Sequence, residues 1–292
     1  MARSTCKLSH DERRRRDRER LAEATRALLH SEGWRAWLRT RATLHTYSLH
    51  NTLLIAQAAR RRGFSPTHVA GFKAWLRLGR AVRKGERGIP ILAPIRVKRS
   101  DDGDENDEAR LFFRTVHVWD VSQTDPLPDF EPAPLAPPHA PIEGDSHAHL
   151  LDSLQALARE LGYTVEYRPL DRAEGLCDRR QRRIRVAAQL APNARVAVLV
   201  HELAHALVGR EAGLTKALEE LVVEAVAYVV CAGAGLDTSP DSVRYIASWG
   251  GDDTPEQLEQ TAQLIDGLAR RIERAVESAT EAEHDVQHGA AA

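Results

Sequence analysis

The stretch 198-VLVHELAHALV-208 holds two histidines four residues apart in an apolar frame. On a helix, His201 and His205 lie on one face, one turn apart, where both imidazoles can bind a single Zn²⁺. Glu202 lies beside them, and a carboxylate there can take a proton from a metal-bound water. This H-E-x-x-H pattern therefore predicts the metal helix of a zinc hydrolase, with Glu202 as the general base. The alternative is a buried amphipathic helix whose histidines fall four apart by chance.

A catalytic zinc usually has three protein ligands and one open position. The next apolar segment, residues 219–230, carries three acids, Glu219, Glu220 and Glu224. Glu224 lies deepest in the apolar run, where a carboxylate is costly unless it has a metal or another partner. We therefore expect Glu224 to be the third ligand, on a second helix that returns across the first.

The charges of the 292-residue chain are distributed unevenly. Residues 1–100 carry a net charge of +17, residues 101–147 carry −10, and the remainder carries −8, although the whole chain is near neutral at −1. A strongly basic first third indicates a polyanionic partner for that part of the protein.

The cysteines and the hydropathy pattern bear on the compartment. Cys6, Cys177 and Cys231 are scattered, which predicts neither a disulfide framework nor a Cys-rich metal site and fits a reducing cytoplasm. No stretch approaches about 18 consecutive apolar residues, and the basic start of the chain lacks the apolar segment of a secretion signal. We expect a cytoplasmic protein with no membrane partner.

Periodicity predicts an α+β fold for the first part of the chain. Apolar residues recur at helical spacing over residues 11–30, 48–62 and 69–79, and Trp34 and Trp37 open a further short helix. Strand-like runs over residues 89–97 and 111–119 predict an antiparallel hairpin. The expected architecture is thus a helical N-terminal domain with a small antiparallel sheet.

A basic cluster follows the helix at residues 69–79. It comprises Arg77, Arg80, Arg83, Lys84 and Arg87, close in sequence to Trp75. Cations that follow a phosphate backbone, combined with aromatic faces for bases, are the components of single-stranded nucleic-acid binding. The cluster and Trp75 therefore predict a nucleic-acid site, although the spacing of Trp75 also fits a core residue.

Three motifs resemble the N-terminal domain of the antirestriction protein ArdC family. They are 47-YSLHNTLLIAQ-57, then 71-GFKAW-75 with 79-GRAVRKGERGI-89, and then 118-VWDVSQT-124, in the order of that family. The resemblance implies a single-stranded-DNA-binding domain over residues 1–125. It also implies that this domain is joined to a zincin-like metallopeptidase domain.

The remaining residues are expected to form a linker and a second domain. Seven prolines from Pro126 to Pro141 predict a stiff linker over residues 126–147. Beyond it we expect a helix over 150–161, strands over 163–167 and 183–187 with a connection over 173–178 between them, and then the H-E-x-x-H helix. The tail at 281–292 is expected to be disordered.

That order of elements resembles the ImmA/IrrE family of zinc peptidases. The resemblance implies a zincin metallopeptidase domain over residues 148–280, in which His201, His205 and Glu224 hold zinc and Glu202 acts on water.

Taken together, these features predict a single-stranded-DNA-binding zinc metalloendopeptidase. Its protein substrate would belong to a mobile-element, antirestriction or repressor-cleavage context. The alternative is a non-proteolytic antirestriction protein that shields single-stranded DNA and whose zinc domain is structural. The two hypotheses differ in whether activity requires Glu202.

Overall fold

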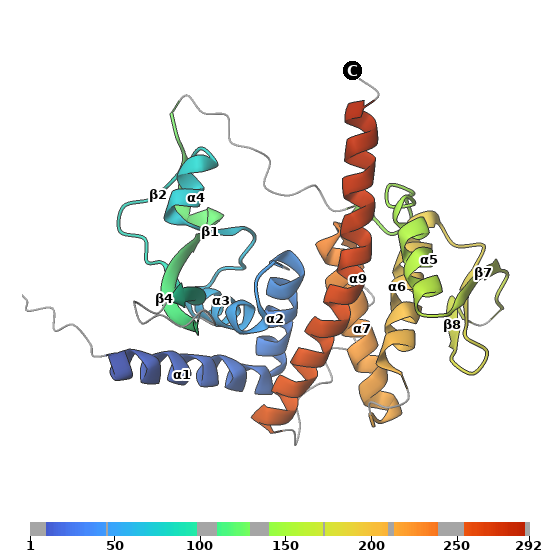
Figure 1. The fold of residues 1–292 in the computed structure, drawn as a ribbon, viewed down its shortest axis with the longest axis horizontal. Helices are drawn as coiled ribbons and strands as arrows, with labels where there is room; N and C mark the ends of the chain where they lie inside the picture. The colour runs from blue at the N-terminus through green and yellow to red at the C-terminus, as the bar shows by residue number, and fades with distance from the viewer. Residues whose placement is uncertain are drawn as a thin grey trace, which may run out of the picture.

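The computed structural model describes residues 10–44, 46–97, 110–128, 140–171, 173–209, 213–238 and 254–289. Within these ranges the chain combines helices with small sheets, which confirms the mixed α and β composition. In Figure 1, α1 to α4 and the first strands lie on one side of the long helix α9, and α5, α6 and strands β7 to β9 lie on the other.

The chain opens with α1 (His10–Arg26), η1 (Ala27–Leu29), α2 (Ser31–Thr43) and α3 (Leu49–Arg62). Helix α3 begins after Ser48, whose side chain accepts a hydrogen bond from the backbone of Asn51, and ends at Gly63 with a left-handed φ of 75°. Trp37 of α2 is buried, and its indole N–H donates to Thr52 Oγ1 of α3 at 3.1 Å. This bond fixes how α2 lies on α3.

Small sheets follow these helices. The elements are β1 (Val69–Gly71), α4 (Phe72–Arg77), β2 (Arg80–Val82), β3 (Ile89–Val97), β4 (Arg110–Asp120), η2 (Val121–Gln123) and β5 (Thr124–Pro126). β3 and β4 pair antiparallel with Ile89 opposite Val118, which confirms the predicted hairpin. β1 pairs with the other edge of β4, so the strand order is β1-β4-β3, and β2 pairs with β5.

The remaining elements are β6 (Ala140–Pro141), α5 (Leu150–Glu160), β7 (Thr164–Arg168), β8 (Gly175–Asp178), β9 (Arg183–Ala187), α6 (Pro192–Val208), α7 (Lys216–Gly233), β10 (Leu236–Asp237) and α9 (Pro255–Gly289). The sheet order β7-β9-β8 makes β8 an edge strand, antiparallel to β9. The expected connection over 173–178 was wrong for residues 175–178. β8 begins with glycine, which is uncommon in strands, and it is stabilised by its pairing with β9. Local sequence preference alone therefore does not predict this strand.

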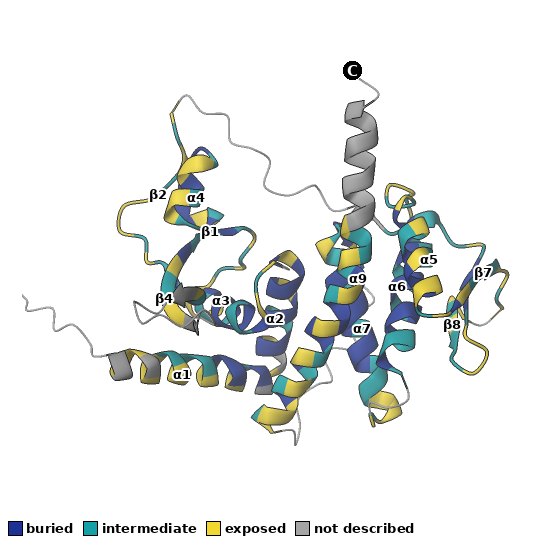
Figure 2. Ribbon diagram, viewed as in Figure 1, coloured by how far each residue is buried: buried dark blue, intermediate teal, exposed yellow. Residues whose placement is uncertain are grey.

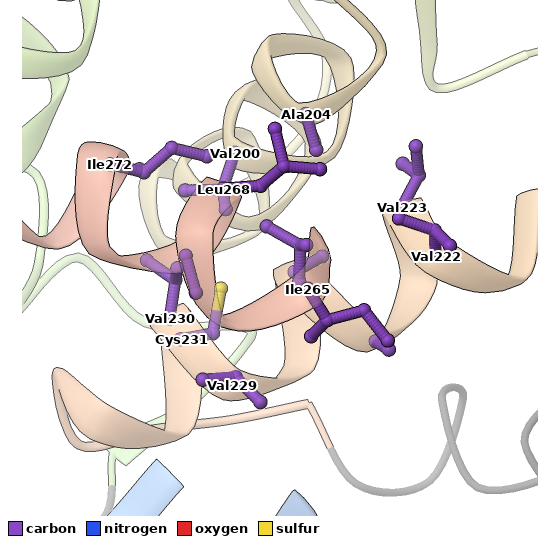
Figure 3. Packing of buried hydrophobic residues seen from close by; sticks show 14 of the residues in the cluster. Val200, Ala204, Val222, Val223, Val229, Val230, Cys231, Ile265, Leu268 and Ile272 are labelled. Atoms are coloured by element: carbon purple, nitrogen blue, oxygen red, sulfur yellow. The ribbon is translucent and has the colours of Figure 1, made fainter. Parts of the chain in front are cut away.

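One buried hydrophobic cluster crosses the expected boundary between the domains. It contains Trp34 and Trp37 of α2 together with Leu199 of α6, Val226 of α7 and Ile265 of α9. Figure 3 shows side chains of α6, α7 and α9 packed against one another in this cluster, and Figure 2 shows buried residues concentrated on α2, α6 and α7 around α9. The expected domains 1–125 and 148–280 therefore share a core.

A buried ion network adds to this shared core. Arg41 of α2 is fully buried, and its guanidinium donates to Asp266 and to both carboxylate oxygens of Glu273 on α9, at 3.0 and 2.9 Å for Glu273. Helix α9 continues to Gly289, past residue 281, where we expected the disordered tail to begin. The Ala- and Glu-rich sequence there has a high helix propensity. In the described parts of the chain, no helix has both the length and the apolar character of a membrane span.

Candidate metal centre and nucleic-acid surface

Helix α6 places the two histidines of the H-E-x-x-H pattern on one face, as the sequence predicted. The ring centroids of His201 and His205 are 5.0 Å apart. Helix α7 packs against α6 and begins after Thr215, whose side chain accepts a hydrogen bond from Leu218 N. The acids in the first half of α7 therefore face the two histidines.

Three residues bring possible metal ligands together. Among the described residues, His201, His205 and Glu220 offer ligand atoms that all lie within 4.8 Å of one another. Glu220 Oε2 lies 3.6 Å from His205 Nε2. This donor set, two imidazoles and one carboxylate, is one that catalytic zinc sites use, so these residues fit a divalent cation.

Glu224, the ligand expected from the sequence, lies one turn further along α7. Its Oε1 is 3.6 Å from His201 Nδ1, and it is not a member of the three-residue cluster. We expected Glu224 to be the ligand because it lies deepest in the apolar run of residues 219–230. The side chains of Glu220 and Glu224 are in fact almost equally exposed, at 35% and 32%. Burial therefore does not separate the two carboxylates, whereas distance groups Glu220 with both histidines.

The ionisation of His201 suits a metal ligand. Burial, with the neighbouring His205, lowers the pKa of His201 to about 4. Its imidazole is therefore neutral at neutral pH, which is the form that binds a metal.

Glu202 is buried between α6 and the edge strand β8. Burial and the charge of Glu220 raise the pKa of Glu202 to about 7, although a hydrogen bond from the backbone of Cys177 opposes this shift. A carboxyl group with a pKa near neutrality can both take up and release a proton under physiological conditions. Glu202 is therefore a buried carboxyl group whose pKa lies near neutrality.

Two cavities open onto these residues. One of about 350 Å³ is lined by His201, Glu202 and Glu224 together with small apolar residues of α6 and α7 such as Ala197 and Ala227. The other, of about 580 Å³, lies on the side of His205 and has polar walls that include Arg179 and Lys216. His201 and Glu202 therefore border both cavities, whereas His205 borders the second.

The predicted nucleic-acid residues lie on α4, on β2 and on the segment after β2. Arg77, Lys84 and Arg87 are exposed. Arg80 is half-buried and donates to Thr124 Oγ1 at 2.8 Å, and Arg83, although exposed, bonds to Asp125 Oδ1 at 3.1 Å. These two guanidiniums hold β5 against β2, so the cations free to meet phosphate are mainly the first three.

Trp75 was wrongly placed among the nucleic-acid contacts. It is 0% exposed, and its indole N–H donates to the carbonyl of Trp119 at 2.9 Å, so it is the core residue that its spacing also fitted. Phe72 on the same helix is 49% exposed and meets Trp119 edge-on, with ring centroids 6.1 Å apart. Phe72 was not among the residues expected from the sequence. Helical periodicity gave no signal for it, because positions 72 and 75 are three residues apart and a helix places them on the same side.

Comparisons with known proteins bear on the expected resemblance to the ArdC family. Residues 20–119 match the family model of the N-terminal domain of anti-restriction factor ArdC, which confirms the resemblance for that part of the chain. The protein y4eC of Sinorhizobium fredii (strain NBRC 101917 / NGR234) is 27% identical over 238 residues, which are 71% of this chain and 71% of that protein.

Two solved structures of antirestriction ArdC from the R388 plasmid are also similar. The metal-free crystal structure is 21% identical, with a TM-score of 0.48, and the match covers 80% of this chain and 83% of that one. The Mn(II)-bound crystal structure is 20% identical, with a TM-score of 0.43, and the match covers 80% and 86%.

Proposed function

We propose that this protein is a single-stranded-DNA-binding metallopeptidase of the antirestriction type, which hydrolyses a peptide bond in a protein target. The grouping of His201, His205 and Glu220 beside the buried Glu202 carries the proposal. Zn²⁺ is the metal that we propose, because two imidazoles and one carboxylate suit it.

The residues of this site have separate tasks in that reaction. A bound divalent cation supplies Lewis-acid chemistry, by polarising a carbonyl oxygen and making a water molecule more acidic. The two histidines and a carboxylate of α7 hold the cation. Glu202, whose pKa is about 7, accepts the proton of the attacking water and delivers it to the leaving amine.

The basic side of the molecule supplies the DNA-binding part of the proposal. Arg77, Lys84 and Arg87 are exposed, Phe72 is exposed on the same helix as Arg77, and residues 20–119 match the ArdC N-terminal domain. Exposed cations with an exposed aromatic ring suit a flexible strand whose bases stack and whose phosphates need counter-charge. DNA binding would then determine where the peptidase acts.

A trapping experiment tests the proposed hydrolysis. Glu202→Gln protein is isolated from cells on single-stranded DNA, and bound proteins are identified and then mixed with wild-type protein and Zn²⁺. We expect the wild-type protein to cleave a trapped partner and the variant to leave it intact, with equal zinc content measured by mass spectrometry. A variant with full turnover would rule out Glu202 as the general base.

A second function, DNA shielding without proteolysis, is favoured by the extent of the family match, which ends at residue 119. It predicts that antirestriction activity survives Glu202→Gln. Activity should then be lost when Arg77, Lys84 and Arg87 are all changed to Gln. The peptidase is supported by the opposite pattern, in which Glu202→Gln abolishes antirestriction activity and the triple change does not.

A further inference from the structure

Two residues outside the three-donor cluster form a support behind His205. Glu219, at the start of α7, has Oε1 2.8 Å from His205 Nδ1. Arg179, in the turn after β8, donates to both carboxylate oxygens of Glu219, with Nη1 3.3 Å from Oε2. Arg179 also donates to the carbonyl oxygen of His205, from Nε at 3.0 Å and from Nη2 at 2.6 Å. One guanidinium therefore holds both the backbone of His205 and the carboxylate that contacts its ring.

The chemistry of this contact determines which nitrogen of His205 carries the proton. Arg179 donates to both carboxylate oxygens of Glu219, so this carboxylate acts as an acceptor toward the neighbouring ring. His205 Nδ1, 2.8 Å from Glu219 Oε1, is then the donor. The other ring nitrogen, Nε2, faces Glu220 Oε2 at 3.6 Å.

Among the described residues, the carboxylate that pairs with His201 lies farther from its ring. His201 Nδ1 lies 3.6 Å from Glu224 Oε1, which is longer than a hydrogen bond. The short contact to a carboxylate that is itself held by arginine thus distinguishes His205 from His201.

We propose that Glu219, held by Arg179, is a positioning residue that fixes the tautomer and the ring orientation of His205, so that Nε2 is presented to the metal. In metal sites, a carboxylate on the second nitrogen of a ligating histidine orients the ring and raises its basicity. The inference rests on the proposed metal site but not on proteolysis. Arg179 also ties the end of β8 to α7, so a purely structural ion pair is the hypothesis that an experiment must exclude.

Ring-nitrogen NMR of His205 in chelator-treated protein separates the two hypotheses. In the wild-type protein we expect the Nδ1–H tautomer, with the Nδ1 proton in a strong hydrogen bond. Glu219→Ala should release the ring into a mixture of tautomers, and Arg179→Met should move the same signals in the same direction. A purely structural pair would change the unfolding midpoint and leave the His205 tautomer as it is.

Zinc affinity, measured by competition with a chelator, is the second readout. Loss of such a supporting carboxylate should weaken binding by roughly 10- to 100-fold. If Glu219→Ala does not fold, Glu219→Gln keeps the size of the side chain and should weaken binding by about tenfold, at the lower end of that range. The matched control is Glu166→Ala, because Glu166 pairs with Arg183 and Arg185 on the nearby sheet, at 3.0 and 3.6 Å. The control should leave zinc affinity unchanged.

The outcomes separate this inference from the proposed function. Unchanged His205 signals and unchanged zinc affinity in the Glu219 variants overturn the positioning role. A wild-type protein that binds zinc with the Nδ1–H tautomer but cleaves no protein retains the positioning role and removes the peptidase. A wild-type protein that binds no divalent metal overturns both.

Discussion

A Cβ atom on Gly175 would lie 2.5 Å from Glu202 Oε1 and 2.6 Å from Val198 Cγ1, closer than real Cβ atoms come to other heavy atoms. The backbone of the edge strand β8 therefore lies directly against the carboxylate that we assign as general base. The backbone of Cys177, two residues further along the strand, donates a hydrogen bond to the same side chain. Strand and carboxylate thus position each other.

Gly175→Ala tests this close approach. We expect the free energy of unfolding to fall by about 1–3 kcal/mol, because the added methyl group must displace Glu202 or separate β8 from α6. Hydrolytic activity should fall with it. The matched control is Gly267→Ala on α9, where an added Cβ meets nothing within 4 Å. That control should raise the unfolding free energy by roughly 0.5–1 kcal/mol, since alanine favours a helix. If urea unfolding gave equal unfolding free energies for Gly175→Ala and Gly267→Ala, the close approach of Gly175 to Glu202 would be contradicted.

The third metal ligand can be assigned by comparing two carboxylates on one face of α7. Because Glu220 groups with both histidines, Glu220→Gln should weaken zinc binding more than Glu224→Gln does. Titration calorimetry of each variant, made under identical buffer conditions, measures the difference. The reverse order would restore Glu224, which the sequence predicted.

Much of this site follows from the sequence, and the parts that do not follow have a common cause. The pair His201 and His205 could be predicted because helical spacing is a local property, and α7 could be predicted from its apolar run. The choice among Glu219, Glu220 and Glu224 could not, because it depends on how α7 is rotated against α6. The role of Gly175 could not be predicted either, since it arises from a contact between β8 and a helix that begins 17 residues later, at Pro192.

Most helices and the hairpin in the first part of the chain followed from periodicity. The helix expected over residues 69–79 was wrong for residues 69–71, which form β1 because they pair with β4. The shared core of Trp34 and Trp37 with α6, α7 and α9 could not be predicted, because a proline-rich segment suggested separate domains. The burial of Arg41 could not be predicted either, because its carboxylate partners Asp266 and Glu273 lie far along the chain on α9.

The raised pKa of Glu202 predicts a pH-dependent stability in chelator-treated protein. Between pH 4.5 and about 7 the folded state retains a proton that the unfolded state has released. The stabilising contribution of Glu202 is therefore complete below pH 4.5 and lost as the pH rises through 7. His201 acts in the opposite sense, because its pKa is lowered to about 4, so its contribution is lost as the pH falls.

Glu202→Gln isolates the contribution of the carboxyl group. As the pH rises from below 4.5 to above 7, the wild-type protein should lose about 3 kcal/mol of unfolding free energy relative to the variant. Urea unfolding at a series of pH values measures this difference. Parallel curves for the two proteins would show that Glu202 has an ordinary pKa.

Two aromatic residues of one short helix should respond in opposite ways to substitution. Phe72→Ala removes an exposed ring near Arg77 and should weaken single-stranded-DNA binding by about 1–3 kcal/mol while leaving the unfolding midpoint nearly unchanged. Trp75→Ala should instead lower the unfolding free energy by about 3–5 kcal/mol, because it leaves a cavity in the core. Fluorescence anisotropy with a labelled oligonucleotide and urea unfolding measure the two effects. Leu176→Ala is the control, because it removes a similarly exposed apolar side chain from β8 and should leave DNA affinity unchanged. Full DNA affinity in Phe72→Ala would exclude the face of α4 that carries Phe72 as the base-stacking surface.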